Sequence, residues 1–103
     1  AVPRDMSKAH LLYERSLDLA HTDVEAAQPA VRIAKMLIDP EGPSYGVEPD
    51  PLRALALFQK AEIGLRIDIA DGQTYYAKRL QEALESQLKA REMVEAEGAV
   101  LLD

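Results

Sequence analysis

The stretch YGVEPDPLRALALFQKA, residues 45–61, indicates the fold more strongly than any other part of the chain. It begins in a loop, because residues 39–50 hold three of the six prolines and two of the five glycines. Asp50 followed by Pro51 is typical of a helix start, with a capping side chain and a proline at the first helical position. The apolar residues that follow recur every three or four positions, which predicts one buried helix face. They are Ala54, Leu57, Phe58, Ala61 and Leu65.

The same spacing predicts three more helices around this one. The first covers residues 5–20 with Asp5 as its N-cap, the second lies within residues 23–38, and the fourth runs from about residue 71 to residue 97. Pro29 lies inside the second helix or marks its true start. The inward positions of the first helix are Ala9, Leu12, Tyr13, Leu17 and Ala20. Strand-like alternation is confined to residues 67–69, so the fold class is all-α.

The two halves of the chain repeat each other. Placing Asp5 on Asp50 also pairs Lys8 with Arg53, Ala9 with Ala54, Leu12 with Leu57, Tyr13 with Phe58 and Arg15 with Lys60. Residues 33–37 similarly lie over residues 76–80. Tandem helix pairs of this length predict an alpha-alpha superhelix. We expect a single helical-repeat domain over residues 1–103, with repeat 1 at about 5–49, repeat 2 at about 50–87 and a C-terminal helix extension at about 88–103.

Residues 45–61 resemble the Sel-one-like repeat family, a longer-period relative of the tetratricopeptide repeat. The resemblance is carried by a Gly-Val turn, an Asp, a basic-Ala step, an aromatic residue and a Lys-Ala step, at Gly46-Val47, Asp50, Arg53-Ala54, Phe58 and Lys60-Ala61. The chain departs from the family where His21 or Arg66 replaces an expected glycine, and where the fourth helix is followed by no second Gly-Val turn. The resemblance implies a bacterial adaptor that holds other proteins on a helical surface, in the periplasm or exported; composition leaves the cytoplasm open as well.

Composition narrows the function classes. The net charge of -6, with Lys and Arg scattered apart from the pair Lys78-Arg79, argues against nucleic acid and anionic membranes as partners. No apolar run approaches the roughly 18–20 residues that a membrane span needs. The chain has no cysteine, which excludes disulfides, thiolate metal sites and cysteine nucleophiles.

Neither histidines nor loop acids form a chemical motif. His10 and His21 lack converging carboxylates or a nucleophile, so we expect no metal and no catalytic role. The acids between residues 39 and 50 do not follow the alternating spacing of a calcium loop. We therefore expect no enzyme and no cofactor.

The leading hypothesis is an adaptor that binds another protein through exposed side chains of its first and third helices and through an exposed tyrosine. The candidates are Lys8, His10, Tyr13, Arg15, Arg53, Gln59, Lys60 and Tyr75. Tyr45 is a second candidate for an exposed tyrosine, because interfaces favour tyrosine. The alternative for Tyr13 is a place in the core, and for the charges a place in solvent.

A second hypothesis is self-association through the C-terminal helix. We expect Tyr76, Leu80, Leu84 and Leu88 to cover the third helix. Val94, Leu101 and Leu102 then have no cover within the chain. The acids Glu92, Glu95 and Glu97 oppose parallel pairing, which predicts an antiparallel or offset homodimer.

Overall fold

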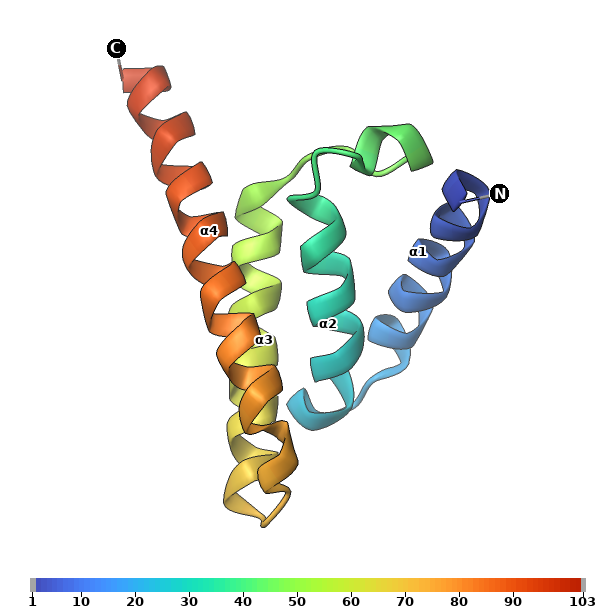
Figure 1. The fold of residues 1–103 in the computed structure, drawn as a ribbon, viewed down its shortest axis with the longest axis vertical. Coiled ribbons are helices and arrows are strands. Elements are labelled where there is room, and N and C mark those ends of the chain that lie inside the picture. Colours follow the sequence, from blue (N-terminus) through green and yellow to red (C-terminus); the bar gives the residue numbers. More distant parts are fainter. Residues whose placement is uncertain (1, 103) are drawn as a thin grey trace.

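The described part of the chain is built from helices joined by turns and loops. The structure, a computed structural model, describes residues 2–102, with side chains for residues 5–98. The four helices are α1 (Val2–Leu19), α2 (Asp23–Leu37), α3 (Pro51–Ala70) and α4 (Ala77–Leu102), with short 3-10 turns η1 (Gly42–Tyr45) and η2 (Thr74–Tyr76) (Figure 1). No strand occurs among the described residues, which confirms the all-α class.

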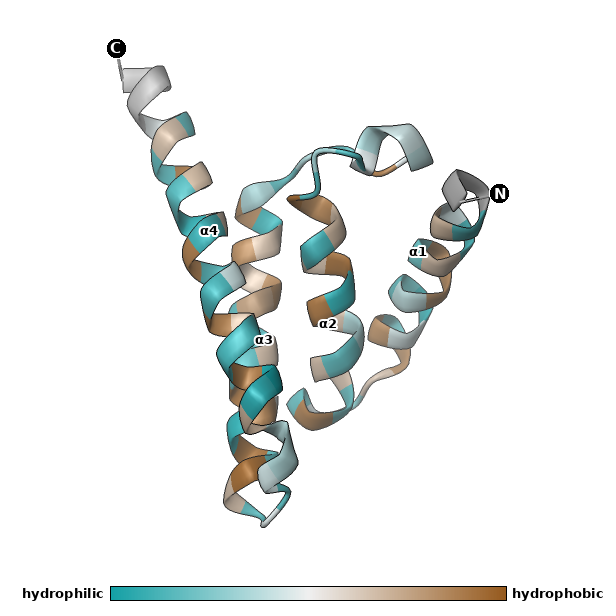
Figure 2. Cartoon of the chain, in the orientation of Figure 1, coloured by the Kyte–Doolittle hydropathy of each residue, from teal (hydrophilic) through white to brown (hydrophobic). Residues whose placement is uncertain are grey.

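The helices form a row in which each packs on the next. α2 lies between α1 and α3, and α4 packs along the other side of α3 (Figure 1). Most of the buried apolar side chains come from α2 and α3. Polar and apolar residues are mixed along α1 and α4 (Figure 2). The principal contact of the molecule is therefore the one between α2 and α3.

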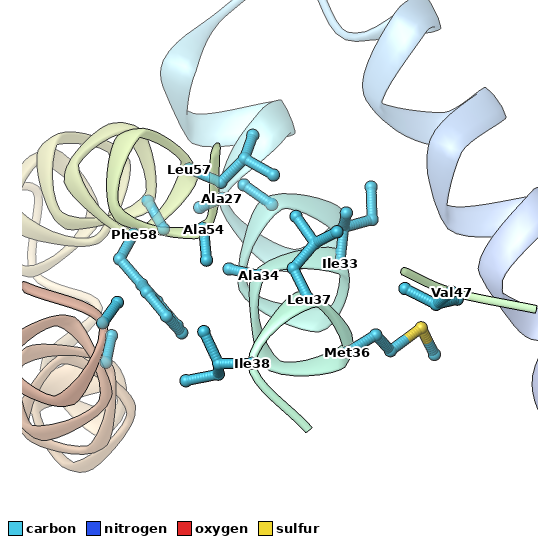
Figure 3. Packing of buried hydrophobic residues seen from close by; sticks show 14 of the residues in the cluster. Ala27, Ile33, Ala34, Met36, Leu37, Ile38, Val47, Ala54, Leu57 and Phe58 are labelled. Carbon is cyan, nitrogen blue, oxygen red and sulfur yellow. The ribbon is translucent and has the colours of Figure 1, made fainter. Parts of the chain in front are cut away.

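Small side chains let α2 and α3 approach closely. Ala30 and Ala34 of α2 and Ala54 and Ala61 of α3 are completely buried. Ala34 and Ala54 lie between the two helices, with Phe58 beside them (Figure 3). α4 adds further buried alanines to this core. The expected inward face of the third helix is thus confirmed.

The loop between α2 and α3 is held by its own side chains. Gly46 has a φ of 87°, a left-handed conformation that favours glycine, and it ends η1. Tyr45 is buried, where its hydroxyl donates to Asp39 at 2.7 Å. Ser7 Oγ donates to the carbonyl of Tyr45, which fastens the loop to α1. The expectation that Tyr45 is an exposed contact residue is therefore wrong.

The helix starts are capped, though not all where we expected. The carboxylate of Asp50 accepts from the backbone N–H of Arg53 at 3.0 Å, which confirms it as the cap of α3. The expected cap of α1 is wrong, because that helix begins before Asp5 and carries it in its first turn, where the helix dipole favours a carboxylate. Thr22 caps α2, and Pro29 lies inside that helix.

The fourth helix begins later than expected. α3 continues to Ala70, and Gly72, with a φ of 101°, makes the turn. α4 begins at Ala77 rather than near Asp71, because η2 comes first. Residues 33–37 end α2, whereas residue 76 ends η2 and residues 77–80 open α4, so these two segments do not occupy equivalent places.

Two leucines expected in the core are exposed. Leu12 is 58% exposed, whereas Leu57, its counterpart in the repeat, is 8% exposed. Leu88 is also 58% exposed, because Ala83 and Ala90 form the inward face of α4 at that level. Val94 is half-buried, and the side chains of Leu101 and Leu102 lie outside the described residues.

Candidate protein-binding surfaces

One predicted binding residue, Arg53 of α3, is paired with Glu14 of α1, and a second, His10 of α1, lies beside the same carboxylate. Both terminal nitrogens of Arg53 donate to the carboxylate of Glu14, at 2.8 and 2.7 Å. This two-point contact is the strong form of an arginine–carboxylate pair. Its hydrogen bonds hold the pKa of Glu14 below its ordinary value and raise the pKa of Arg53. His10 Nε2 lies 3.2 Å from the same carboxylate, outside hydrogen-bonding geometry.

Two more of the predicted binding residues, Lys60 and Tyr13, make contacts within the fold. Lys60 Nζ lies 2.9 Å from the carboxylate of Asp23, which joins α3 to the first turn of α2. Tyr13 is half-buried and packs against the core, as the alternative for this residue proposes. Both side chains thus make contacts within the fold, and a role for them in binding a partner stays a prediction.

The loop acids are likewise used within the fold. Asp39 accepts from the backbone N–H of Glu41 and from the Tyr45 hydroxyl, and these bonds lower the pKa of Asp39. Burial, together with the Asp39 carboxylate, raises the pKa of Tyr45 to about 12. The hydrogen bond between Tyr45 and Asp39 therefore stabilises the loop between α2 and α3.

The other four predicted residues are exposed but do not form one surface. Lys8 and Arg15 share the outer side of α1, and Gln59 lies on the outer side of α3. Tyr75 is 68% exposed at the turn before α4. Its ring lies 4.4 Å from that of Tyr76, centroid to centroid, at a tilt of 34°.

A cleft between α2 and α4 gathers a different set of side chains. Its floor is apolar, formed by Ala27 and Val31 of α2 and Leu65 of α3, and its volume is about 200 Å³. Its rim is polar and consists of Gln28, Arg32, Lys35, Arg79 and Glu82. Small-molecule sites usually measure about 300–1,000 Å³, so this cleft suits one or two side chains better than a cofactor.

The rim is positively charged in a negatively charged chain. Arg32, Lys35 and Arg79 face a single carboxylate, that of Glu82, whereas the whole chain carries -6. Within residues 5–98, none of the three cations forms an ion pair. The guanidinium of Arg79 lies 5.7 Å from the centre of the Tyr76 ring, a cation–π contact that orients it at the rim.

The cleft could not be predicted from the sequence, although part of its lining follows a visible pattern. Gln28, Arg32 and Lys35 follow one another at four- and three-residue spacing, so they share one face of α2. No local pattern shows that the start of α4 brings Arg79 opposite them. Arg79 lies near Arg32 because α3 and η2 reverse the chain direction and place the start of α4 beside α2.

Neither a metal site nor a membrane span is found in the described part of the chain. No group of three or more His, Asp or Glu side chains there is arranged to hold a metal ion. None of the described helices is long and apolar enough to cross a membrane. The chain matches no protein-family model, and no curated protein or solved structure is similar enough to it to indicate a relative.

Proposed function

We propose that the chain is a protein-interaction module that binds an acidic segment of another protein in the cleft between α2 and α4. The observation that carries this proposal is an apolar floor beside three cations, Arg32, Lys35 and Arg79, that form no ion pair within residues 5–98. An apolar side chain of the partner enters the cleft above Val31 and Leu65. Carboxylates on either side of that side chain meet the cations of the rim.

Charge supports an acidic partner in particular. A chain of net charge -6 repels acidic proteins at long range, so a local cationic cleft selects the segment that docks and its orientation. The apolar floor supplies the buried contact that an ion pair at an exposed rim lacks. Both elements are needed for a specific site.

The wider proposal is a non-enzymatic adaptor of the Sel-one-like type, with its helix pairs in a superhelical arrangement. The left-handed Gly46, the Asp50 cap and the buried Ala54 and Phe58 support it, because they give the residues of the repeat signature the roles that a helix-pair repeat requires. Absence of catalysis is supported by the lining of the cleft, in which Glu82 is the one side chain that could serve as a base at neutral pH.

Site-specific crosslinking tests the proposed function. A photo-crosslinking residue replaces the exposed Gln28 at the rim, or the exposed Ala96 of α4 as a remote control, and the chain is irradiated in cells of its source. We expect a discrete adduct with another protein from position 28 only. The double change Arg32→Glu/Lys35→Glu removes the adduct.

A matched charge control completes this test. The change Lys78→Glu/Arg91→Glu reverses two exposed cations of α4 that do not line the cleft, and it leaves the adduct in place. An adduct that forms equally from both crosslinker positions contradicts the proposed site. So does an adduct that survives charge reversal at Arg32 and Lys35.

The second candidate function is self-association through α4. The last turns of this helix extend past the start of α3 (Figure 1), and Leu88 is 58% exposed on it. The exposure of Leu88 supports a contact through the middle of α4.

A further inference from the structure

We propose that the outer face of α1 binds the outer face of α4 in a second copy of this chain, with the two helices antiparallel. This contact does not involve the cleft and does not depend on the proposed binding of an acidic segment; it rests on the second candidate function, self-association through α4, and specifies the surface that α4 would contact. It joins copies head to tail, so that the row of helices in one copy continues into the next.

The face on α1 is a stripe of alternating charge and leucine. Lys8, Leu12, Arg15 and Leu19 follow one another at spacings of four, three and four residues, which places them on one side of the helix. All four are exposed, Leu12 by 58% and Leu19 by 64%. The opposite side of α1 packs against the core, so this stripe has no partner within residues 5–98.

The face on α4 is a stripe of opposite charge with the same spacing. Gln81, Glu85, Leu88 and Glu92 are also four, three and four residues apart, and all four are exposed. Ala83 faces the core, so the stripe lies away from α3.

The two stripes match when one helix runs against the other. With Leu12 set opposite Leu88, Arg15 meets Glu85 and Lys8 meets Glu92 at the same levels, because the spacings reverse into each other. Leu19 then meets Gln81, whose long side chain can lie flat on it. In a parallel arrangement Leu19 would instead meet the carboxylate of Glu95, so the antiparallel pairing is favoured.

Like faces repel while unlike faces attract. Two copies joined α1 to α1 bring Lys8 and Arg15 against the same cations, and two copies joined α4 to α4 bring Glu85 against Glu92. The α1–α1 and α4–α4 contacts are those that a dimer with two-fold symmetry would use. The charges therefore favour the unlike contact, which is heterologous and leads to rings or filaments.

The fold already contains a contact of this kind. α3 packs on α2 through a face that includes Leu57, which points toward Ala27 (Figure 3), and its Lys60 pairs with Asp23 at 2.9 Å. In the alignment that places Asp5 on Asp50, Leu57 and Lys60 correspond to Leu12 and Arg15. The face of α1 that is free is thus the one that α3 uses to dock on a neighbouring helix with an acidic side chain.

Two variants that each block one face test the contact. Leu12→Lys closes the α1 face and leaves the α4 face intact, whereas Leu88→Lys does the reverse. In analytical ultracentrifugation we expect the mass of the wild-type chain to rise above 11.4 kDa with concentration and each variant to remain a monomer. An equimolar mixture of the two variants forms a dimer that grows no further, because one open face of each kind remains.

The controls separate this contact from loss of folding and from other surfaces. Leu52→Lys, at a 65% exposed position on α3 outside both stripes, associates as the wild type does, and circular dichroism shows all variants equally helical. Arg15→Glu and Glu85→Arg each weaken association at least tenfold, and the chain carrying both regains it. A wild-type chain that stays monomeric at millimolar concentration overturns the proposal. So does a mixture of the two blocked variants that stays monomeric, or a self-associating Leu12→Lys chain, which would indicate a different surface.

Discussion

Replacing Gly64 with alanine is expected to destabilise the protein, although helix propensity alone predicts the reverse. Gly64 lies within α3, where alanine is favoured over glycine by about 1 kcal/mol. A Cβ at this position would lie 2.2 Å from the carbonyl oxygen of Asp23 and 3.1 Å from the Cβ of Ala27. The obstacle at 2.2 Å is backbone in the first turn of α2, so the two helices must separate.

The size of the loss follows from these two opposing effects. Overpacking of a tight interior costs about 1–3 kcal/mol, and a backbone obstacle places Gly64→Ala at the upper end. After subtraction of the propensity gain, we expect a net loss of about 2 kcal/mol. For a chain of this size that loss lowers the melting temperature by roughly 8–16 °C.

A second glycine provides the matched control. Gly98 lies within α4, and a Cβ there would meet nothing within 4 Å outside its own helix among the described residues, so Gly98→Ala should stabilise by up to about 1 kcal/mol. Urea and thermal unfolding followed by circular dichroism measure both variants. If Gly64→Ala were as stable as the wild type or more so, the close contact of α3 with α2 would be refuted.

Three further predictions concern the packing, the cap and the ion pair of α3. Ala54 is completely buried, so Ala54→Leu should cost about 1–3 kcal/mol in urea unfolding; an unchanged midpoint would contradict the helix register. Asp50→Ala should cost about 0.5–2 kcal/mol with the circular dichroism spectrum unchanged, and a neutral effect would contradict the cap. The hydrogen bonds from Arg53 lower the pKa of Glu14 from 4.5. The stabilisation of the fold by this pair is therefore complete above pH 4.5, and it is lost as the pH falls through the lowered pKa of Glu14. Because this pair is partly exposed, the loss is at most about 1 kcal/mol, and Arg53→Gln should abolish it; acid unfolding with the same pH dependence in both chains would contradict the pairing.

The parts of the fold that sequence predicts well are those set by local chemistry. The Asp50 cap, the loop around Gly46 and the buried face of α3 each depend on neighbouring residues, and the structure has them as expected. The start of α1 was missed because a carboxylate such as Asp5 is favoured both at a cap and in the first turn.

The parts that sequence does not predict depend on which helices become neighbours. Tyrosine is a common residue in exposed interfaces, yet Tyr45 is buried. Its hydroxyl donates to Asp39, and its carbonyl accepts from Ser7 of α1. Leu88 fits an apolar stripe, but α4 turns its alanines inward so that the helices can approach. Only the arrangement of α2, α3 and α4 shows that Arg32 and Arg79 share one cleft.

The most direct test of the protein-binding account is a selection from a displayed library of random peptides. The account predicts that the chain enriches acidic peptides carrying one large apolar side chain, and that these compete with one another for the cleft. The double change Arg32→Glu/Lys35→Glu should abolish the enrichment, whereas Lys78→Glu/Arg91→Glu should leave it intact. Enriched peptides without an acidic bias, or binding that persists after charge reversal at the rim, would contradict the account.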